Sequence, residues 1–239
     1  MPSTSPTPRP VAGARARARA EVRAEIVAAA SRQLATVGAP GLSLRAIARE
    51  LGMVSSAIYR YFASRDDLLT ALIIEAYDDL GAATEQSVAA TAGQAPLNRW
   101  VTAASVIRGW AIEHPHDYAL LYGSPVPGYA APADTVVPGT RVTRALIRIV
   151  HDAIADGSLV PPAEPIELSA ATLGAFEFLR GELDLDTTDD VVLAALAAWT
   201  QLFGHLSFEL FGQTHGLIVD HDAFFLETSR LMGTRIGLR

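Results

Sequence analysis

Residues 43–69 read SLRAIARELGMVSSAIYRYFASRDDLL, and this stretch decides the fold of the N-terminal part of the chain. Ser43 is a suitable N-cap for a short helix, and Gly52 can take the left-handed conformation that ends one. Between them, apolar residues recur at i, i+3, i+4 and i+7, the spacing of one buried helical face: Leu44, Ile47, Ala48 and Leu51. The pattern predicts a short amphipathic helix followed by a sharp turn.

A second short helix is predicted from about Val54 to Arg60, with Ile58 facing inward. Its outer surface would carry small polar, aromatic and basic side chains, namely Ser55, Ser56, Tyr59 and Arg60. Small side chains at the start of such a helix let the backbone and hydroxyls approach base edges closely. Two helices joined by a short turn containing Gly form the geometry that inserts a recognition helix into the major groove. We therefore expect a helix-turn-helix that binds double-stranded DNA.

Longer helices are predicted on both sides of this motif. Residues 21–37 carry apolar residues at helical spacing and are followed by the Gly and Pro residues of 38–41, which predicts a support helix that stops there. Ser64 begins a capping box, with Asp67 in place of the usual Glu, for a long helix over about 65–90. This last helix is expected to lead from the DNA-binding module into a second domain.

Charge is distributed unevenly along the 239 residues. The whole chain has a formal net charge of -7 and a sequence pI near 5.3. Up to residue 65 there are ten arginines and three acidic residues, a net charge of +7, whereas the remainder carries nine arginines and 23 acidic residues, a net charge of -14. The basic charge is concentrated in the part that holds the helix-turn-helix, so we expect this part to bind DNA and the acidic remainder to stay off it.

Composition narrows the class of protein. With 50% hydrophobic residues, the chain can bury a sizeable core in one large or two modest domains. It contains no cysteine, which excludes disulfides and thiolate metal sites and is compatible with the cytoplasmic location that we expect. No run of about 18 apolar residues free of charge was identified, so neither a membrane span nor a membrane partner is expected.

The N-terminus has three competing interpretations. Residues 1–10 are rich in Ser, Thr and Pro, and residues 13–19 are basic without an acid, so residues 1–19 are expected to form a disordered arm. The arm could be an organelle transit peptide, although its arginines are not confined to one helical face. It could be a solvated tail. It could also contact phosphates or the minor groove beside the helix-turn-helix through Arg15, Arg17 and Arg19.

The stretch from Gly41 to Leu69 resembles the DNA-binding signature of TetR/AcrR-family transcriptional regulators. The resemblance covers roughly residues 20–75, with the helix-turn-helix, the Tyr-x-Tyr-Phe group and the capped following helix in the same order. It implies a DNA-binding domain over residues 20–68 and an all-helical homodimer, usually a repressor. The larger C-terminal domain of such a protein binds a small-molecule effector and thereby moves the two DNA modules.

The resemblance also assigns roles to residues of this motif. Ser43 and Tyr59 would contact phosphates, while Arg45 would face bases or backbone. Arg65 stands where the family commonly has Lys, at a helix start where its side chain and the helix amides could meet a phosphate. The DNA-contacting residues expected here are Ser43, Leu44, Arg45, Val54, Ser55, Ser56, Tyr59, Arg60, Tyr61 and Arg65.

Residues 69–239 are predicted to form a helical ligand-binding and dimerisation domain, which makes the fold all-α with about nine to ten helices. Helices are expected over about 96–114, 116–122, 140–156, 166–182, 189–211 and 220–235, with a long irregular loop at 123–139 that holds four Pro and three Gly. The run Trp199–Gly212, with an upstream His-Pro and Tyr-Gly-x-Pro-Val-Pro-Gly-Tyr segment, resembles a subgroup of TetR-like C-terminal domains.

In that family the last long helices pair with their twofold mates in a four-helix bundle. This resemblance assigns the dimer interface to residues 166–182 and 189–211, with small residues allowing close approach. The expected interface residues are Gly174, Phe178, Ala195, Phe203, His205, Leu206 and Leu210. A regulator also needs a concave apolar pocket with few polar groups, and the expected lining residues are Trp110, His114, Tyr118, Tyr122, Phe176 and Trp199, which are otherwise simply core.

Other groups have simpler interpretations than a site. His114 and His116 lack the i, i+4 spacing of a metal pair and are better explained as helix-end groups, while His205 and Glu209 have that spacing on an apolar helix, where a hydrogen-bonded core or interface histidine is favoured. The acidic residues of 184–190 lack the Gly and spaced oxygens of a calcium loop, so no metal site is expected. No nucleophile elbow, phosphate loop, dinucleotide fingerprint or zinc motif was identified, so neither an enzyme nor a cofactor is expected.

Overall fold

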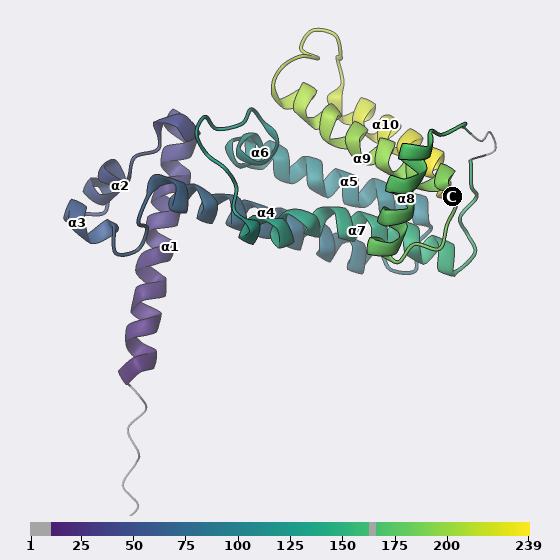
Figure 1. Cartoon of the computed structure of the whole chain (residues 1–239). Coiled ribbons are helices and arrows are strands. Elements are labelled where there is room, and N and C mark those ends of the chain that lie inside the picture. Colours follow the sequence, from purple (N-terminus) through teal and green to yellow (C-terminus); the bar gives the residue numbers. More distant parts are fainter. Residues whose placement is uncertain (1–10, 163–165) are drawn as a thin grey trace, which may run out of the picture. The chain divides into compact units, whose positions relative to one another are not determined.

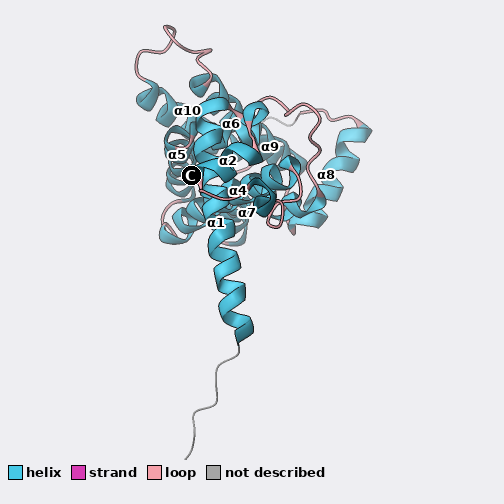
Figure 2. Cartoon of the chain, turned by 90° about the vertical axis from the view of Figure 1, so that its left-hand side faces the viewer, coloured by secondary structure: helices cyan, strands magenta, loops and turns pink. Residues whose placement is uncertain are grey.

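The computed structural model describes residues 11–162 and 166–239, and this part of the chain is built from helices and loops without a strand (Figure 2). It contains ten α-helices and two short 3-10 helices. The expected all-α fold is confirmed. The chain separates into two compact units, one formed by residues up to Leu72 together with Val126–Ala130, and the other by Ile73–Pro125 and Ala131–Arg239.

The first unit consists of α1 (Val11–Val37), η1 (Ala39–Gly41), α2 (Leu44–Glu50), α3 (Ser55–Ile58) and the first turns of α4 (Arg65–Ala90). α2 packs against both α1 and α3. The core of this unit is formed by the buried side chains of Ile26, Ala30, Leu34, Leu44, Ile47, Ile58, Phe62 and Leu68. α1 therefore supports the two short helices as the sequence predicted.

The start of α1 differs from the prediction. The helix begins at Val11, ten residues before the expected start at Glu21, so residues 11–19 are helical and not a disordered arm. Alternating Ala and Arg have no apolar periodicity, but both residue types have high intrinsic helix propensity. Residues 1–10 of the expected arm lie outside the described residues.

The second unit is a bundle of longer helices (Figure 1). After α4 come α5 (Pro96–Glu113), α6 (Pro115–Tyr122), η2 (Ala133–Thr135), α7 (Val136–Ala155), α8 (Ala170–Leu183), α9 (Asp189–Leu210) and α10 (His221–Ile236). α5 packs against α7, α9 and α10, and α9 packs along α10. The core therefore gathers around α5, where Ala103, Ala104 and Ile107 are fully buried.

Two helices of this unit begin at residues that differ from those predicted from the sequence. α7 begins at Val136 rather than near Thr140, because Pro138 falls in the first turn, where a missing N–H costs nothing. α8 begins at Ala170 rather than Ile166, with the Ser169 hydroxyl accepting a hydrogen bond from the Thr172 N–H at 3.2 Å. The predicted long loop is correspondingly shorter.

α9 stands out by its apolar composition over 22 residues. By length and composition alone, α9 is the one helix in the described part of the chain that could cross a membrane. The sequence analysis did not identify this apolar run. Leu202 and Leu206 are fully buried in the core, so the apolar composition of α9 has a packing role. Only 28% of its most apolar 18-residue window is buried within the chain, which leaves an apolar face of α9 uncovered.

Candidate nucleic-acid interface and ligand cavity

The turn between α2 and α3 is held by local hydrogen bonds. The Ser43 hydroxyl accepts from the Ala46 N–H at 3.4 Å, as expected for the N-cap of α2. Gly52 has φ +65°, the left-handed conformation that favours glycine, and the Met53 N–H then donates to the Ala48 carbonyl at 2.8 Å. These bonds set the angle at which α3 leaves α2.

α3 buries a single side chain, Ile58, and exposes the residues around it. Val54 is 69% and Tyr59 44% exposed, although both are large. Four further expected DNA contacts on α2, on α3 and just after α3 are exposed: Ser55, Ser56, Arg60 and Arg45. The unit therefore presents hydroxyls, a phenol and guanidinium groups on the surface of its second and third helices.

The packing corrects one expected contact and gives another a partner within the chain. Leu44 is only 6% exposed because it belongs to the apolar face of α2, so its side chain cannot reach DNA. The Arg65 side chain is 31% exposed, and its Nη2 donates to the Ala39 carbonyl at 2.6 Å. Arg65 thus ties the start of α4 to η1, a structural role that sequence spacing does not reveal.

Basic residues of α1 reach the segment that follows α3. Arg19 Nη2 donates to the Arg60 carbonyl at 2.9 Å, and its guanidinium lies 5.5 Å from the ring centre of the half-buried Tyr61. Arg23 lies 4.7 Å from the ring centre of Phe62 in the same way. The hydrogen bond between Arg19 and the Arg60 carbonyl was not predicted from the sequence, because the two residues are 41 positions apart and local patterns do not pair them.

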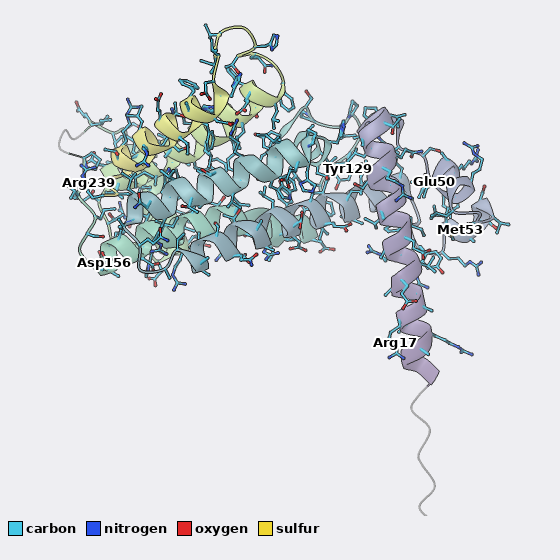
Figure 3. All side chains as sticks on the ribbon, turned by 180° about the vertical axis from the view of Figure 1, so that it is seen from behind. Arg17, Glu50, Met53, Tyr129, Asp156 and Arg239 are labelled. Atoms are coloured by element: carbon cyan, nitrogen blue, oxygen red, sulfur yellow. The ribbon has the colours of Figure 1, made fainter. Side chains whose placement is uncertain are left out.

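Arg15 and Arg17 lie on the part of α1 that extends beyond these contacts, where Figure 3 shows Arg17 near the free end of the helix. Both residues are exposed. A helix fixes the spacing of their charges, whereas a disordered arm would not.

In the second unit, most of the expected pocket residues pack against one another. The Trp110 indole N–H donates to Asp79 at 2.7 Å, and the Trp110 ring stacks on His114, whose Nδ1 lies 3.0 Å from the Trp110 carbonyl at the end of α5. The Tyr118 hydroxyl donates to the Phe203 carbonyl at 2.9 Å. Their polar atoms already have partners within the chain.

Burial also keeps the two tyrosines of α6 neutral. It raises the pKa of Tyr118 to about 12 and raises the pKa of Tyr122 further. The Tyr122 ring packs 4.4 Å from the Phe203 ring, which continues to Trp199 at 5.8 Å. This row of aromatic rings fills the space where the sequence predicted a pocket.

A cavity with an uncharged lining lies between α5, α7, α8 and α9 and has a volume of about 170 Å³. Of the six expected lining residues, Trp199 alone contributes to it, and Phe176 is buried elsewhere on α8. The lining residues are Trp100, Thr143, Leu146, Ile147, Val150, Leu179, Leu183, Leu185, Val192, Ala195, Leu196 and Trp199. None of these side chains is charged.

The expected dimer residues separate into exposed and buried groups. Gly174 and Phe178 of α8 are exposed, Phe178 to 66%. Phe203 and Leu206 instead face the core, which corrects their assignment to an interface. The three remaining expected interface residues are partly buried in the chain: Ala195, His205 and Leu210.

A charged network connects three helices of the second unit. Arg108 of α5 donates both Nε and Nη2 to Glu209 of α9, with a shortest distance of 2.6 Å, and its Nη1 lies 2.8 Å from Asp222 of α10. His205 is half-buried beside it, and its Nδ1 lies 3.3 Å from the Thr228 hydroxyl. Burial lowers the pKa of His205, as expected for a histidine packed into the core.

Comparison with known proteins adds independent evidence. Residues 26–72 match the family described as bacterial regulatory proteins, tetR family, and residues 100–231 match the tetracyclin repressor-like C-terminal domain. The HTH-type transcriptional regulator Rv1816 of Mycobacterium tuberculosis strain H37Rv is 41% identical over 224 residues, which cover 92% of this chain and 94% of that protein.

Solved structures show the same arrangement of helices. The crystal structure of the regulatory protein SCO4313 has a TM-score of 0.73 at 34% identity, covering 95% of this chain and 98% of that one. A protein of unknown function from Rhodococcus sp. RHA1 has a TM-score of 0.65 at 27% identity, covering 90% and 94% of the two chains. The similarity thus extends through both units.

Proposed function

We propose that this chain, which belongs to the TetR family of DNA-binding transcriptional regulators, is a repressor released from its operator by a small apolar effector. Regulators of this family bind DNA operators and small molecules and act as dimers. The observation that carries the proposal is the exposed, hydrogen-bonding face of α3 on the basic unit of an otherwise acidic chain.

For operator binding, we assign the phosphate contacts to Ser43, Tyr59 and the arginines of α1. Ser55 and Ser56, at the start of α3, would face base edges, where small hydroxyl side chains permit close approach. Because arginine–phosphate contacts release counterions, binding should weaken steeply as salt rises. Arg15 and Arg17 support this assignment by their exposure on the free end of α1.

For dimerisation, we assign the uncovered face of α9. It carries small and apolar exposed residues at helical spacing, Ala197, Gly204 and Phe208, of which Phe208 is 57% exposed. A second copy would cover this face, which accounts for a helix so apolar and so little buried within one chain. Such a dimer would hold two recognition helices for two half-sites in the cytoplasm.

The effector would act by binding better to the state whose recognition helices have the wrong spacing. Its effect on operator affinity then equals its differential binding energy for the two states. There are two alternatives to a repressor. One is an activator that uses the same helices, and the other is a helical ligand-binding protein that no longer binds DNA.

The test is a fluorescence-anisotropy titration of the full chain against tiled fragments of the DNA upstream of its own gene. We expect one fragment to bind far more tightly than the others at physiological salt, and analytical ultracentrifugation to show two chains on it. Failure to bind any fragment even at low salt would overturn the proposal. Binding followed by increased transcription of the bound promoter in vitro would favour the activator.

A further inference from the structure

We propose that the cavity under α8 binds a neutral, single-ring organic molecule that carries one hydrogen-bond acceptor, and that Trp199 is the residue that recognises this acceptor. This inference rests on the proposed function, because it names the chemical class of the effector. It comes from four properties of the cavity: its size, the lack of charge in its lining, one unpartnered donor and the weak packing of α8.

Size sets the first limit on the ligand. The cavity has a volume of about 170 Å³. A dry apolar cavity of about 150 Å³ accommodates benzene, so this one fits roughly one substituted ring. Sterols, bicyclic drugs and long acyl chains would have to extend out of the cavity or displace α8.

The lining excludes charged ligands. Its side chains are aliphatic apart from Thr143 and two tryptophans, Trp100 and Trp199, and no cation or carboxylate reaches the cavity. Moving an ion from water into such a site without a partner of opposite charge costs far more than apolar contacts return. A carboxylate, phosphate or ammonium ligand is therefore excluded.

One donor in the lining lacks an acceptor. The indole N–H of Trp100 is satisfied, since it donates to the Ser229 carbonyl at 3.1 Å. The corresponding atom of Trp199, Nε1, is buried and has no hydrogen-bond partner in the described part of the chain. Buried donors are rarely left unpaired, because the unmade hydrogen bond destabilises the protein. A carbonyl or ether oxygen on the ligand would supply the missing acceptor once the Trp199 side chain turns its Nε1 toward the cavity, which gives the site its preference.

α8 provides the movable wall. Leu179 and Leu183, one turn apart on α8, line the cavity, while most of the helix is exposed and buries only Phe176. A ligand in the cavity would add apolar contacts to a helix that has few. Binding should therefore order α8, which gives the experiment a readout independent of DNA.

Three probes of nine non-hydrogen atoms separate the determinants: acetophenone, α-methylstyrene, in which a methylene replaces the carbonyl oxygen, and benzoate. Calorimetry on the full chain is expected to show acetophenone binding at least about 5-fold more tightly than α-methylstyrene, the equivalent of one net hydrogen bond. Benzoate should not bind. Hydrogen exchange of residues 170–183 should slow with acetophenone.

Two variants identify the site. Trp199→Phe removes the donor and keeps an aromatic ring, so acetophenone and α-methylstyrene should then bind equally. Ala195→Leu fills the cavity and should abolish binding of both, with circular dichroism reporting that the helices remain. Equal affinities for the two neutral probes in the wild-type chain, tight benzoate binding, or an unchanged preference in Trp199→Phe would each overturn the inference.

The outcome can be separated from that of the proposed function. Loss of all DNA binding with the acetophenone preference retained would refute the repressor and leave the ligand class standing. Operator binding with no uptake of either neutral probe would refute the ligand class and leave the DNA-binding regulator standing.

Discussion

α3 and α8 are alike in burying one side chain each, Ile58 and Phe176, yet they expose different chemistry. α3 exposes hydroxyls and a phenol within a basic unit, whereas α8 exposes Leu173, Phe178 and small residues within an acidic one. Exposed hydrogen-bonding groups cost little free energy, because they bond to water until the phosphates of DNA take the place of that water. Exposed apolar side chains contribute favourable free energy only when another apolar surface covers them and removes them from water. Low burial therefore points to different partners in the two units.

The two helices are also held differently. α3 continues into a chain of backbone hydrogen bonds, in which the N–H groups of Tyr61 and Phe62 both donate to the Ile58 carbonyl. α8 is held at its ends, by the Ser169 cap and by the ion pair between Arg180 and Asp189. We expect α3 to unfold only with its unit and α8 to open by itself.

The largest expected effect tests this difference. Ile58→Ala should destabilise the first unit by about 2–5 kcal/mol, because it leaves a cavity in a small core. Phe176→Ala should free α8 alone, raising hydrogen exchange over residues 170–183 while α5 and α9 stay protected. Hydrogen-exchange mass spectrometry measures both. Loss of protection throughout the second unit in Phe176→Ala would show that α8 is part of its cooperative core.

The next effect concerns the exposed faces. Tyr59→Ala should weaken binding to all DNA sequences by roughly 10-fold or more, since hydrogen bonds to charged groups contribute about 1.5–3 kcal/mol. Tyr59→Phe should show the same loss if the hydroxyl is responsible, and Ser55→Ala should change sequence preference instead. Leu217→Ala, at a position between α9 and α10 that is 75% exposed, is the control and should leave the affinity for DNA unchanged. Unaltered binding in both Tyr59 variants, with the fold retained, would contradict the assignment of α3.

A smaller effect separates the units by pH. All six histidines lie in the second unit, and burial lowers the pKa of His205 below its usual 6.5, against the opposing influence of Glu209. The unfolded chain then binds this proton more readily, so stability is lost as pH falls below about 6.5 and is restored above it.

Thermal unfolding at about pH 7.5 and pH 5.5 measures this dependence. The wild-type second unit should lose more stability on acidification than His205→Gln does. The first unit has no histidine and should change little by comparison. Equal acid sensitivity of the wild type and His205→Gln would contradict the assignment to His205.

The smallest expected effect lies at the free end of α1. Replacing Arg15 and Arg17 by Ala should reduce the slope of log affinity against log salt by about 0.9 for each phosphate that is no longer neutralised, with only a modest decrease of affinity at physiological salt. Replacing Arg144, an exposed arginine of α7, is the control for net charge. An unchanged slope would show that this part of α1 is solvated and does not contact DNA.

Much of the first unit was predictable because its determinants are local. The cap at Ser43, the left-handed Gly52 and the cap at Ser64, which accepts from the Asp67 N–H at 3.0 Å, are each specified by residue type over a few positions. Periodicity also marked Leu44 as apolar. Its burial follows from that same periodicity, although Leu44 was also counted among the expected DNA contacts.

The cavity could not be predicted, because apolar periodicity identifies the faces that turn inward and not the space left between them. Trp110, Tyr118 and Tyr122 have the residue types that line ligand pockets. In the structure, however, Trp110 is hydrogen-bonded to Asp79, and both tyrosines contact Phe203. The lining at Leu179 and Leu185 depends on how α8 packs, which no local pattern encodes. Likewise, Arg19 and Arg65 acquired structural partners that are distant in the sequence.

The helical free end of α1 has a consequence for what else can occupy the same DNA. Residues 11–18 extend beyond the Arg19 contact, and at 1.5 Å per residue they span about 12 Å. At 3.4 Å per base pair this length corresponds to roughly three to four base pairs of duplex. If this stretch of helix lies along the DNA backbone, it would lengthen the nuclease footprint at each half-site by at least that amount. A neighbouring polymerase or activator would be displaced by the same distance.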